Sequence, residues 1–78
     1  MDKISVQIKT NSLEIGSDIQ RARERRKLSQ KELAELAGVH VTTIRRLEAK
    51  QTIPLFKTLD KILDVLNMEL HVVKRETR

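Results

Sequence analysis

The segment Ser29–Gly38 carries both the start and the stop signal of one short helix, and it constrains the fold more than any other feature. Ser29 stands three residues before Glu32. The Ser29 hydroxyl can therefore accept a hydrogen bond from the backbone amide of Glu32, while the Glu32 carboxylate accepts one from the backbone amide of Ser29. Gly38 can end the helix because glycine adopts the left-handed conformation without a steric penalty. The residues between supply an apolar stripe: Leu33, Ala34, Leu36 and Ala37. The sequence therefore predicts a helix from Gln30 up to Gly38.

Three further helices follow from apolar residues at helical spacing. The first is predicted at about 13–26, where Asn11 and Ser12 offer capping oxygens. Gly16 inside it costs up to about 1 kcal/mol relative to alanine and indicates close packing. The next helix is predicted at 41–48, and after a loop at 49–53 the last runs from Pro54 to about residue 66.

Alternating apolar and polar residues predict a short strand near each end of the chain, at 3–9 and at 68–73. We therefore divide the chain into an N-terminal arm, residues 1–10, a helical domain, residues 11–66, and a C-terminal strand with a basic tail, residues 67–78. The fold class expected from these elements is all-α, with four to five helices and short terminal strands.

The charge balance favours a polyanionic partner. Lys and Arg number 16 against 11 Asp and Glu, which gives a net charge of +5. One Phe with no Trp or Tyr leaves little aromatic surface for stacking single-stranded bases, so a duplex is the expected partner. The absence of cysteine excludes disulfides and thiolate metal sites and fits the cytoplasm. No apolar run approaches the roughly 18 residues of a membrane span, and the Arg cluster lacks the Trp and Phe that anchor basic helices on anionic membranes, so no membrane partner is expected.

A capped helix, a short turn with glycine and a second helix form the unit that places its second helix in the major groove of DNA. The exposed N-terminal end and outer face of that helix supply the predicted base-reading residues: His40, Val41, Thr42, Arg45 and Arg46. Arg46 can donate two hydrogen bonds to guanine O6 and N7, and Thr42 or Val41 can contact a thymine methyl group. The capped N-terminus of the preceding helix, the nearby cations and the N-terminal end of the second helix predict a set of phosphate contacts: Arg26, Lys27, Ser29, Gln30, Thr43 and Lys50.

Residues 15–66 resemble the Xre/Cro/C1-type helix-turn-helix domains, which include the lambdoid phage repressors. The matching residues are Leu28-Ser29-Gln30, Leu33-Ala34, Ala37-Gly38-Val39, Thr43-Ile44, Leu47-Glu48, Pro54, Thr58-Leu59 and Lys61-Ile62-Leu63. The resemblance implies a lambda-repressor-like fold in which Gln30 binds the DNA backbone and Arg23 pairs with Glu48. The chain departs from the family pattern at Ala49-Lys50 and Val41, which leaves the DNA sequence preference open.

The C-terminal strand resembles the HipB-like antitoxin branch, in which such a strand pairs across a dimer. The resemblance implies a set of interface residues: Met68, Leu70, His71 and Val72. Pairing with residues 3–9 of the same chain is the alternative, because a lone strand leaves its edges unpaired. A two-fold dimer would set two recognition helices about 34 Å apart and predicts a palindromic operator.

Two functions remain as hypotheses. The first is a homodimeric transcriptional repressor in the bacterial cytoplasm, bound to nucleoid DNA, as the antitoxin of a HipB-like toxin–antitoxin operon that represses its own promoter. The second is a protein-interaction module that neutralises a partner, such as a toxin kinase, with DNA binding secondary. We expect no catalytic residue, metal or cofactor, because His40 and His71 lack both a paired nucleophile and metal-ligand spacing.

Overall fold

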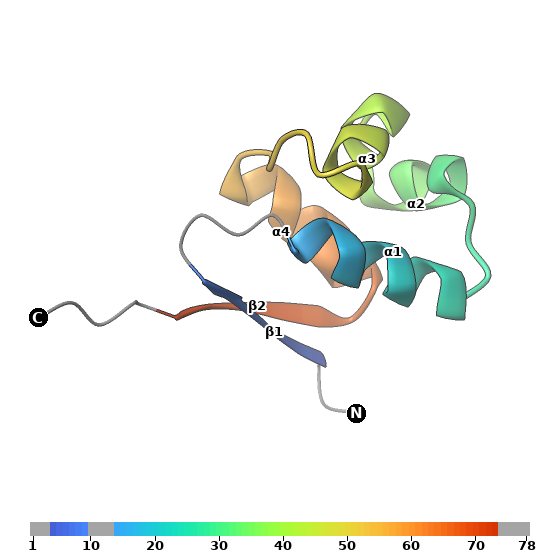
Figure 1. Ribbon diagram of the computed structural model, residues 1–78. Coiled ribbons are helices and arrows are strands. Elements are labelled where there is room, and N and C mark those ends of the chain that lie inside the picture. Colours follow the sequence, from blue (N-terminus) through green and yellow to red (C-terminus); the bar gives the residue numbers. More distant parts are fainter. Residues whose placement is uncertain (1–3, 10–13, 74–78) are drawn as a thin grey trace, which may run out of the picture.

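The computed structural model describes residues 4–9 and 14–73, with side chains described for residues 14–69. Its elements in chain order are β1 (Ile4–Lys9), α1 (Ile15–Arg25), α2 (Gln30–Ala37), α3 (Val41–Glu48), α4 (Phe56–Val65) and β2 (Met68–Val73). The four helices form the body of the molecule, and the two strands lie on the side opposite α3 (Figure 1).

The predicted helices are present with small shifts at their ends. α1 begins at Ile15, its N-cap is Glu14 and no side chain caps it; the predicted capping residues 11 and 12 lie outside the described residues. α4 begins at Phe56 with Leu55 as its N-cap, so Pro54 precedes the helix and does not stand in its first turn. Proline fits there equally well, because it disfavours helical conformation in the residue before it.

The two ends of α2 confirm the local signals in the sequence. The Glu32 amide donates to Ser29 Oγ at 2.9 Å, and the Ser29 amide donates to Glu32 Oε1 at 2.8 Å. At the other end Gly38 takes the left-handed conformation with φ 70° and ψ 35°. The amides of Gly38 and Val39 then donate to the carbonyls of Glu35 and Ala34. These two hydrogen bonds end the helix, and the chain then turns sharply into α3.

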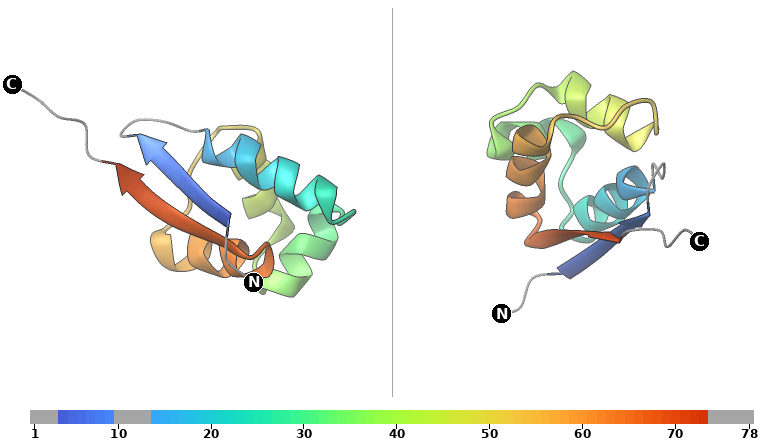
Figure 2. Two further views of the ribbon diagram at one scale, coloured as in Figure 1. Left: turned by 90° about the horizontal axis from the view of Figure 1, so that it is seen from below. Right: turned by 90° about the vertical axis from the view of Figure 1, so that its left-hand side faces the viewer.

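The terminal strands pair with each other inside one chain. β1 and β2 form a two-stranded parallel sheet, in register from Ile4 opposite Met68 to Lys9 opposite Val73. The whole helical unit is the connection between them, and the two views of Figure 2 show the strands side by side along one side of the helices. Of the two pairings that the sequence left open, the structure therefore contains the one within the chain.

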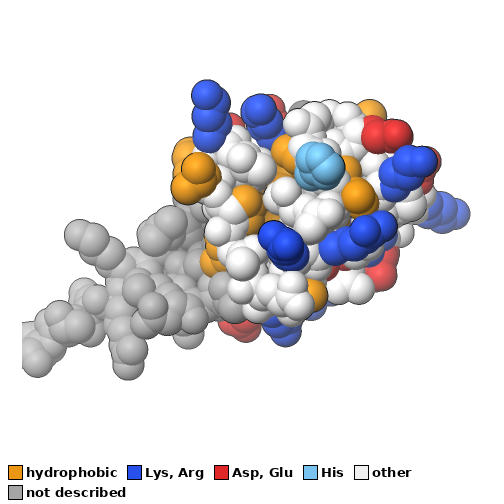
Figure 3. Space-filling model, turned by 90° about the horizontal axis from the view of Figure 1, so that it is seen from above, with side chains coloured by type: hydrophobic (Ala, Val, Ile, Leu, Met, Phe, Trp, Pro, Cys, Tyr) orange, Lys and Arg blue, Asp and Glu red, His pale blue; other side chains and the backbone are white. Residues whose placement is uncertain are grey.

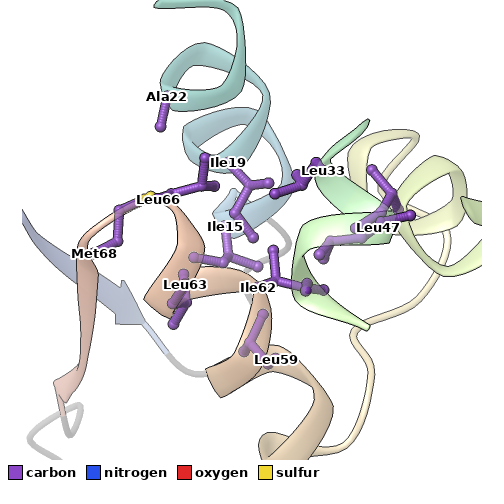
Figure 4. Packing of buried hydrophobic residues seen from close by; sticks show 13 residues of the cluster. Ile15, Ile19, Ala22, Leu33, Leu47, Leu59, Ile62, Leu63, Leu66 and Met68 are labelled. Atoms are coloured by element: carbon purple, nitrogen blue, oxygen red, sulfur yellow. The ribbon is translucent and has the colours of Figure 1, made fainter. Parts of the chain in front are cut away.

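The core lies between the helices and collects apolar residues at helical spacing from all four. It consists of Ile15, Ile19, Ala22, Leu33, Ala34, Ala37, Ile44, Leu47, Leu59, Ile62, Leu63, Leu66 and Met68. Their side chains converge from different helices, as Figure 4 shows for α1, α2, α3 and α4. Burying these chains in one cluster is the main contribution to stability that a domain of this size has.

Gly16 brings α1 and α3 into direct backbone contact. A Cβ atom at this position would collide with the carbonyl oxygen of Leu47 and would lie 3.4 Å from Glu48 Cα. A glycine in a helix destabilises it, so this one is explained by the packing it permits. α1 therefore rests against the C-terminal end of α3 and helps to fix the orientation of that helix.

Candidate nucleic-acid interface

The helix α3 has one face in the core and one face in solvent. Ile44 and Leu47 are 0% and 1% exposed, and they anchor the inner face. The exposed residues of the helix include three that lie one or two positions from Ile44: Thr42, Arg45 and Arg46. The 3.6-residue period of the helix produces this division, because residues three or four apart share a face. The outer face of α3 thus carries polar and basic groups on a firmly packed support.

The side chains of Arg45 and Arg46 have no hydrogen bond or ion pair within the part of the chain that the structure describes. Their guanidinium groups are exposed to solvent, and each offers five N–H donors in a planar fork. Seen from the side of α3, the surface carries Lys and Arg side chains around a histidine, with apolar side chains exposed in patches between them (Figure 3). The outer face of α3 can therefore donate to an acceptor-rich partner.

The N-terminal end of α3 is open. His40 is the N-cap residue, it is exposed, and its side chain makes no capping hydrogen bond. Val41 is half-buried and packs against the core, so only part of its side chain is accessible. Thr43 is also half-buried. Of the predicted base-reading residues, His40 and Thr42 thus present the larger accessible surface at this end.

A buried ion pair joins α1 to the last residue of α3. Arg23 Nε donates to Glu48 Oε2 at 2.8 Å and Arg23 Nη2 donates to Glu48 Oε1 at 2.9 Å. The two side chains are 11% and 4% exposed, respectively. The hydrogen bond to Glu48 raises the pKa of Arg23, against the opposing effect of burial. This two-pronged geometry is the strongest arrangement that an arginine and a carboxylate form.

Two more groups complete this network. Arg23 Nη1 donates to the carbonyl of Leu28 at 2.8 Å, and Gln30 Nε2 donates to Glu48 Oε1 at 3.0 Å. The network therefore ties together α1, the turn before α2, the first residue of α2 and the end of α3. The sequence pointed to the pair of Arg23 and Glu48 through a family resemblance, but it held no signal for the contacts of Leu28 and Gln30.

Four of the predicted phosphate-binding residues fall into two groups: Ser29 and Gln30 have hydrogen-bond partners within the protein, whereas Lys27 and Lys50 are exposed cations. Ser29 Oγ accepts the Glu32 amide, and Gln30 is half-buried beside Glu48. Lys27 and Lys50 are exposed and hold the left-handed conformation, with φ 57° and 62°. Both follow the end of a helix, where glycine is the usual residue, so each lysine occupies a backbone position that costs free energy. Neither position could be identified as strained from the sequence.

Arg26 has a structural partner that the sequence did not reveal. Its Nη2 donates to the carbonyl of Leu66 at 2.7 Å, at the C-terminal end of α4. The last carbonyls of a helix lack partners inside the helix and attract a cation. Arg26 therefore closes α4, and phosphate binding by this residue stays a prediction.

The predicted dimer residues lie in β2. The side chain of Met68 is 3% exposed and belongs to the core of its own chain, so it is already covered. The backbones of Leu70, His71 and Val72 lie opposite Val6, Gln7 and Ile8 of β1. The side chains of residues 70–72 lie outside those that the structure describes, and their place in a dimer interface stays a prediction.

A family model described as helix-turn-helix matches residues 19–73, from the middle of α1 to the end of β2. No curated protein matches the chain. Among the described residues, no helix is long and apolar enough to cross a membrane.

Proposed function

Because the chain belongs to the helix-turn-helix family of DNA-binding transcription regulators, we propose that it is a repressor that recognises a specific double-stranded sequence through α3. In this proposal α3 enters the major groove with its outer face towards the bases. Arg46 contacts a guanine with two hydrogen bonds, and Thr42 contacts a neighbouring base edge or methyl group. Arg45 and His40 extend the contacted surface at its margins.

The backbone of the duplex is contacted by the elements on either side of α3. The N-terminus of α2 presents amides that have no partner inside the helix, together with the positive end of the helix dipole. Ser29 and Gln30 stand at this end, and Thr43 lies in the first turn of α3. The exposed cations Lys27 and Lys50 would add contacts that set the position of the protein and release counterions.

One observation carries the proposal: the polar, basic face of α3 stands on a helix that is fixed from behind. Ile44 and Leu47 are buried in the core, and Glu48 is held by Arg23. A helix whose backbone is already fixed loses little backbone entropy when it binds. An exposed arginine pair on such a support favours a base-reading role over a merely solvated surface.

The experiment is a titration of the protein against its own upstream region and against random duplex, each at two salt concentrations. We expect tight binding to the upstream region, and weaker binding to random duplex that falls steeply with salt. Arg46→Ala should lower the preference for the upstream region by about 10- to 100-fold, the value of one two-pronged base contact. Lys61→Ala removes one positive charge from the exposed side of α4 and is the matched control. Equal binding of both duplexes by the wild type would reject sequence-specific repression.

The dimer and the operon context are finer parts of the same proposal. We propose a homodimer that uses β2 and binds a palindromic operator, as the antitoxin of a HipB-like operon. A two-stranded sheet leaves one open edge on each strand, which supports pairing with a second copy. A footprint with two equal halves separated by one turn of DNA would support this arrangement. A single half-site footprint would contradict it.

A second function, binding of a partner protein, is favoured by one patch on the surface. Leu55 and Phe56 are 83% and 66% exposed at the start of α4, and Ile53 before them is 40% exposed. Apolar side chains gathered on a small surface often mark an interaction site. If the protein neutralises a toxin encoded by a neighbouring gene, co-expression should yield a stable complex. Leu55→Ser with Phe56→Ser should then release the toxin without loss of DNA binding, and Leu36→Ser, another exposed position, is the control.

A further inference from the structure

One oxygen of the Glu48 carboxylate accepts hydrogen bonds from two different side chains. Oε1 accepts from Arg23 Nη2 at 2.9 Å and from Gln30 Nε2 at 3.0 Å, whereas Oε2 accepts from Arg23 Nε at 2.8 Å. The Glu48 side chain is 4% exposed, so water contributes little to its solvation. Arg23 neutralises the charge, and the contact with Gln30 adds a third hydrogen bond to the carboxylate.

Gln30 is the first residue of α2, where the helix presents its free amides. A glutamine side chain has three rotatable bonds and carries two N–H donors and one carbonyl acceptor. One of its N–H groups is held by Glu48. The second N–H points away from the first across the planar amide, so the bond to Glu48 fixes where this remaining donor lies.

We propose that Glu48 is a positioning residue for DNA binding: its Oε1 orients the carboxamide of Gln30 so that the second N–H meets a phosphate oxygen of the bound duplex. This inference rests on the proposed function. Glu48 itself contacts no DNA in this arrangement. Its effect passes through Gln30 and is the same for every duplex sequence, because a phosphate contact carries no base information.

The same bond couples two parts of the interface. Glu48 ends α3, and Arg23, which holds it, is fixed in turn by the carbonyl of Leu28. The backbone contact on α2 and the base-reading face of α3 are therefore held in one orientation by a single carboxylate. A displacement of the end of α3 would carry the amide of Gln30 with it.

A double-mutant cycle tests the positioning role. Gln30→Ala in the wild-type background should weaken binding to every duplex by about five- to tenfold, the loss expected for one hydrogen bond. In a Glu48→Asp background the shorter side chain cannot reach both partners, so Gln30→Ala should there cost less than twofold. Equal losses in the two backgrounds would show that Gln30 acts independently of Glu48 and would overturn the inference.

Arg23→Lys is the matched control for damage to the network. It removes the two-pronged bond and the contact with Leu28, but it leaves Glu48 Oε1 available to Gln30. Its destabilisation should resemble that of Glu48→Asp, while the full five- to tenfold effect of Gln30→Ala remains. Loss of that effect in Arg23→Lys as well would assign the whole network a structural role only and would also overturn the inference. Every variant is assayed below its unfolding temperature.

A spectroscopic measurement separates this inference from the proposed function. One of the two side-chain amide protons of Gln30 should resonate downfield of its position in a solvated glutamine in the free wild-type protein, because it is hydrogen-bonded to the carboxylate of Glu48. In Glu48→Asp the bonded signal should move towards the position of a solvated amide. No change would refute the contact. If the signal moves but the wild type binds no duplex even at low salt, the DNA function fails and the positioning role fails with it.

Discussion

Glu48 is the buried charged residue of the described chain, and its surroundings explain why the fold tolerates it. Removing a carboxylate from water costs several kcal/mol unless charge and hydrogen bonds compensate. Here three hydrogen bonds reach its two oxygens, and no buried side-chain nitrogen or oxygen among the described residues lacks a partner. The compensation is complete only while every donor is present, so single substitutions should be costly.

Arg23→Ala tests this dependence. The substitution leaves Glu48 buried with only Gln30 as a partner, so the free energy of unfolding should fall by about 3–5 kcal/mol. Arg21→Ala is the control, because Arg21 pairs with Asp18 on the exposed side of α1 and should cost less than about 1 kcal/mol. Urea denaturation of both variants measures the two values. A similar small loss in both would mean that the buried pair adds little to stability.

Lys50 combines a strained backbone with a predicted contact to phosphate. Its φ is 62°, a region where a side chain costs about 1 kcal/mol relative to glycine. Lys50→Gly should therefore raise the free energy of unfolding by about 1 kcal/mol and yet weaken DNA binding and its salt dependence. Lys50→Ala loses the same charge without relief of the strain, so it should weaken DNA binding equally with no gain in stability. Unchanged DNA affinity in both variants would remove Lys50 from the interface.

At the scale of the elements, the helices are held at their ends. α1, α2 and α3 each close with the same pair of backbone bonds, around Lys27, Gly38 and Lys50 respectively. Arg26, the residue after α1, donates a hydrogen bond to the carbonyl of Leu66 at the end of α4. The contact between Gly16 and Leu47 then sets the distance between α1 and α3. The orientation of the recognition helix is therefore decided by contacts behind it.

Gly16→Ala should disturb that contact although alanine favours a helix. The added methyl group meets the backbone of Leu47, which cannot move without shifting α3, so we expect a net loss of about 1–3 kcal/mol in stability and weaker specific DNA binding. Gly38→Ala provides the contrast, because a Cβ there meets nothing within 4 Å and only the left-handed backbone is penalised. Thermal unfolding and DNA titration of the two variants should show loss of specificity in Gly16→Ala alone. A shift of specificity in Gly38→Ala of the same size would contradict this account.

At the scale of the whole molecule, one small core supports both the helices and the sheet. Met68 belongs to that core, while the rest of β2 pairs with β1. A chain of this size buries only about 60% of its unfolded surface, so a second copy would add stability as well as a second recognition helix. Dimerisation would therefore both stabilise a small domain and present two recognition helices to a palindromic operator.

A truncation after Glu69 tests the role of β2 without removing Met68 from the core. We expect the helical domain to fold, its mass to fall from that of a dimer to that of a monomer, and operator affinity to fall by at least tenfold through loss of the second half-site. Light scattering and DNA titration measure these changes, and circular dichroism checks the helices. A dimer mass in the truncated protein would place the interface elsewhere.

The sequence by itself determined those features whose hydrogen bonds join residues near one another along the chain. Ser29, Glu32 and Gly38 set the limits of α2 within a few residues, and apolar spacing identified the core positions of each helix. The tertiary structure decided the partners that lie far apart: Gln30 meets Glu48 18 residues away, and Arg26 meets Leu66 40 residues away. It also paired β2 with β1 in the chain. Local bonds follow from helical geometry alone, whereas these contacts exist only once the helices have packed against one another.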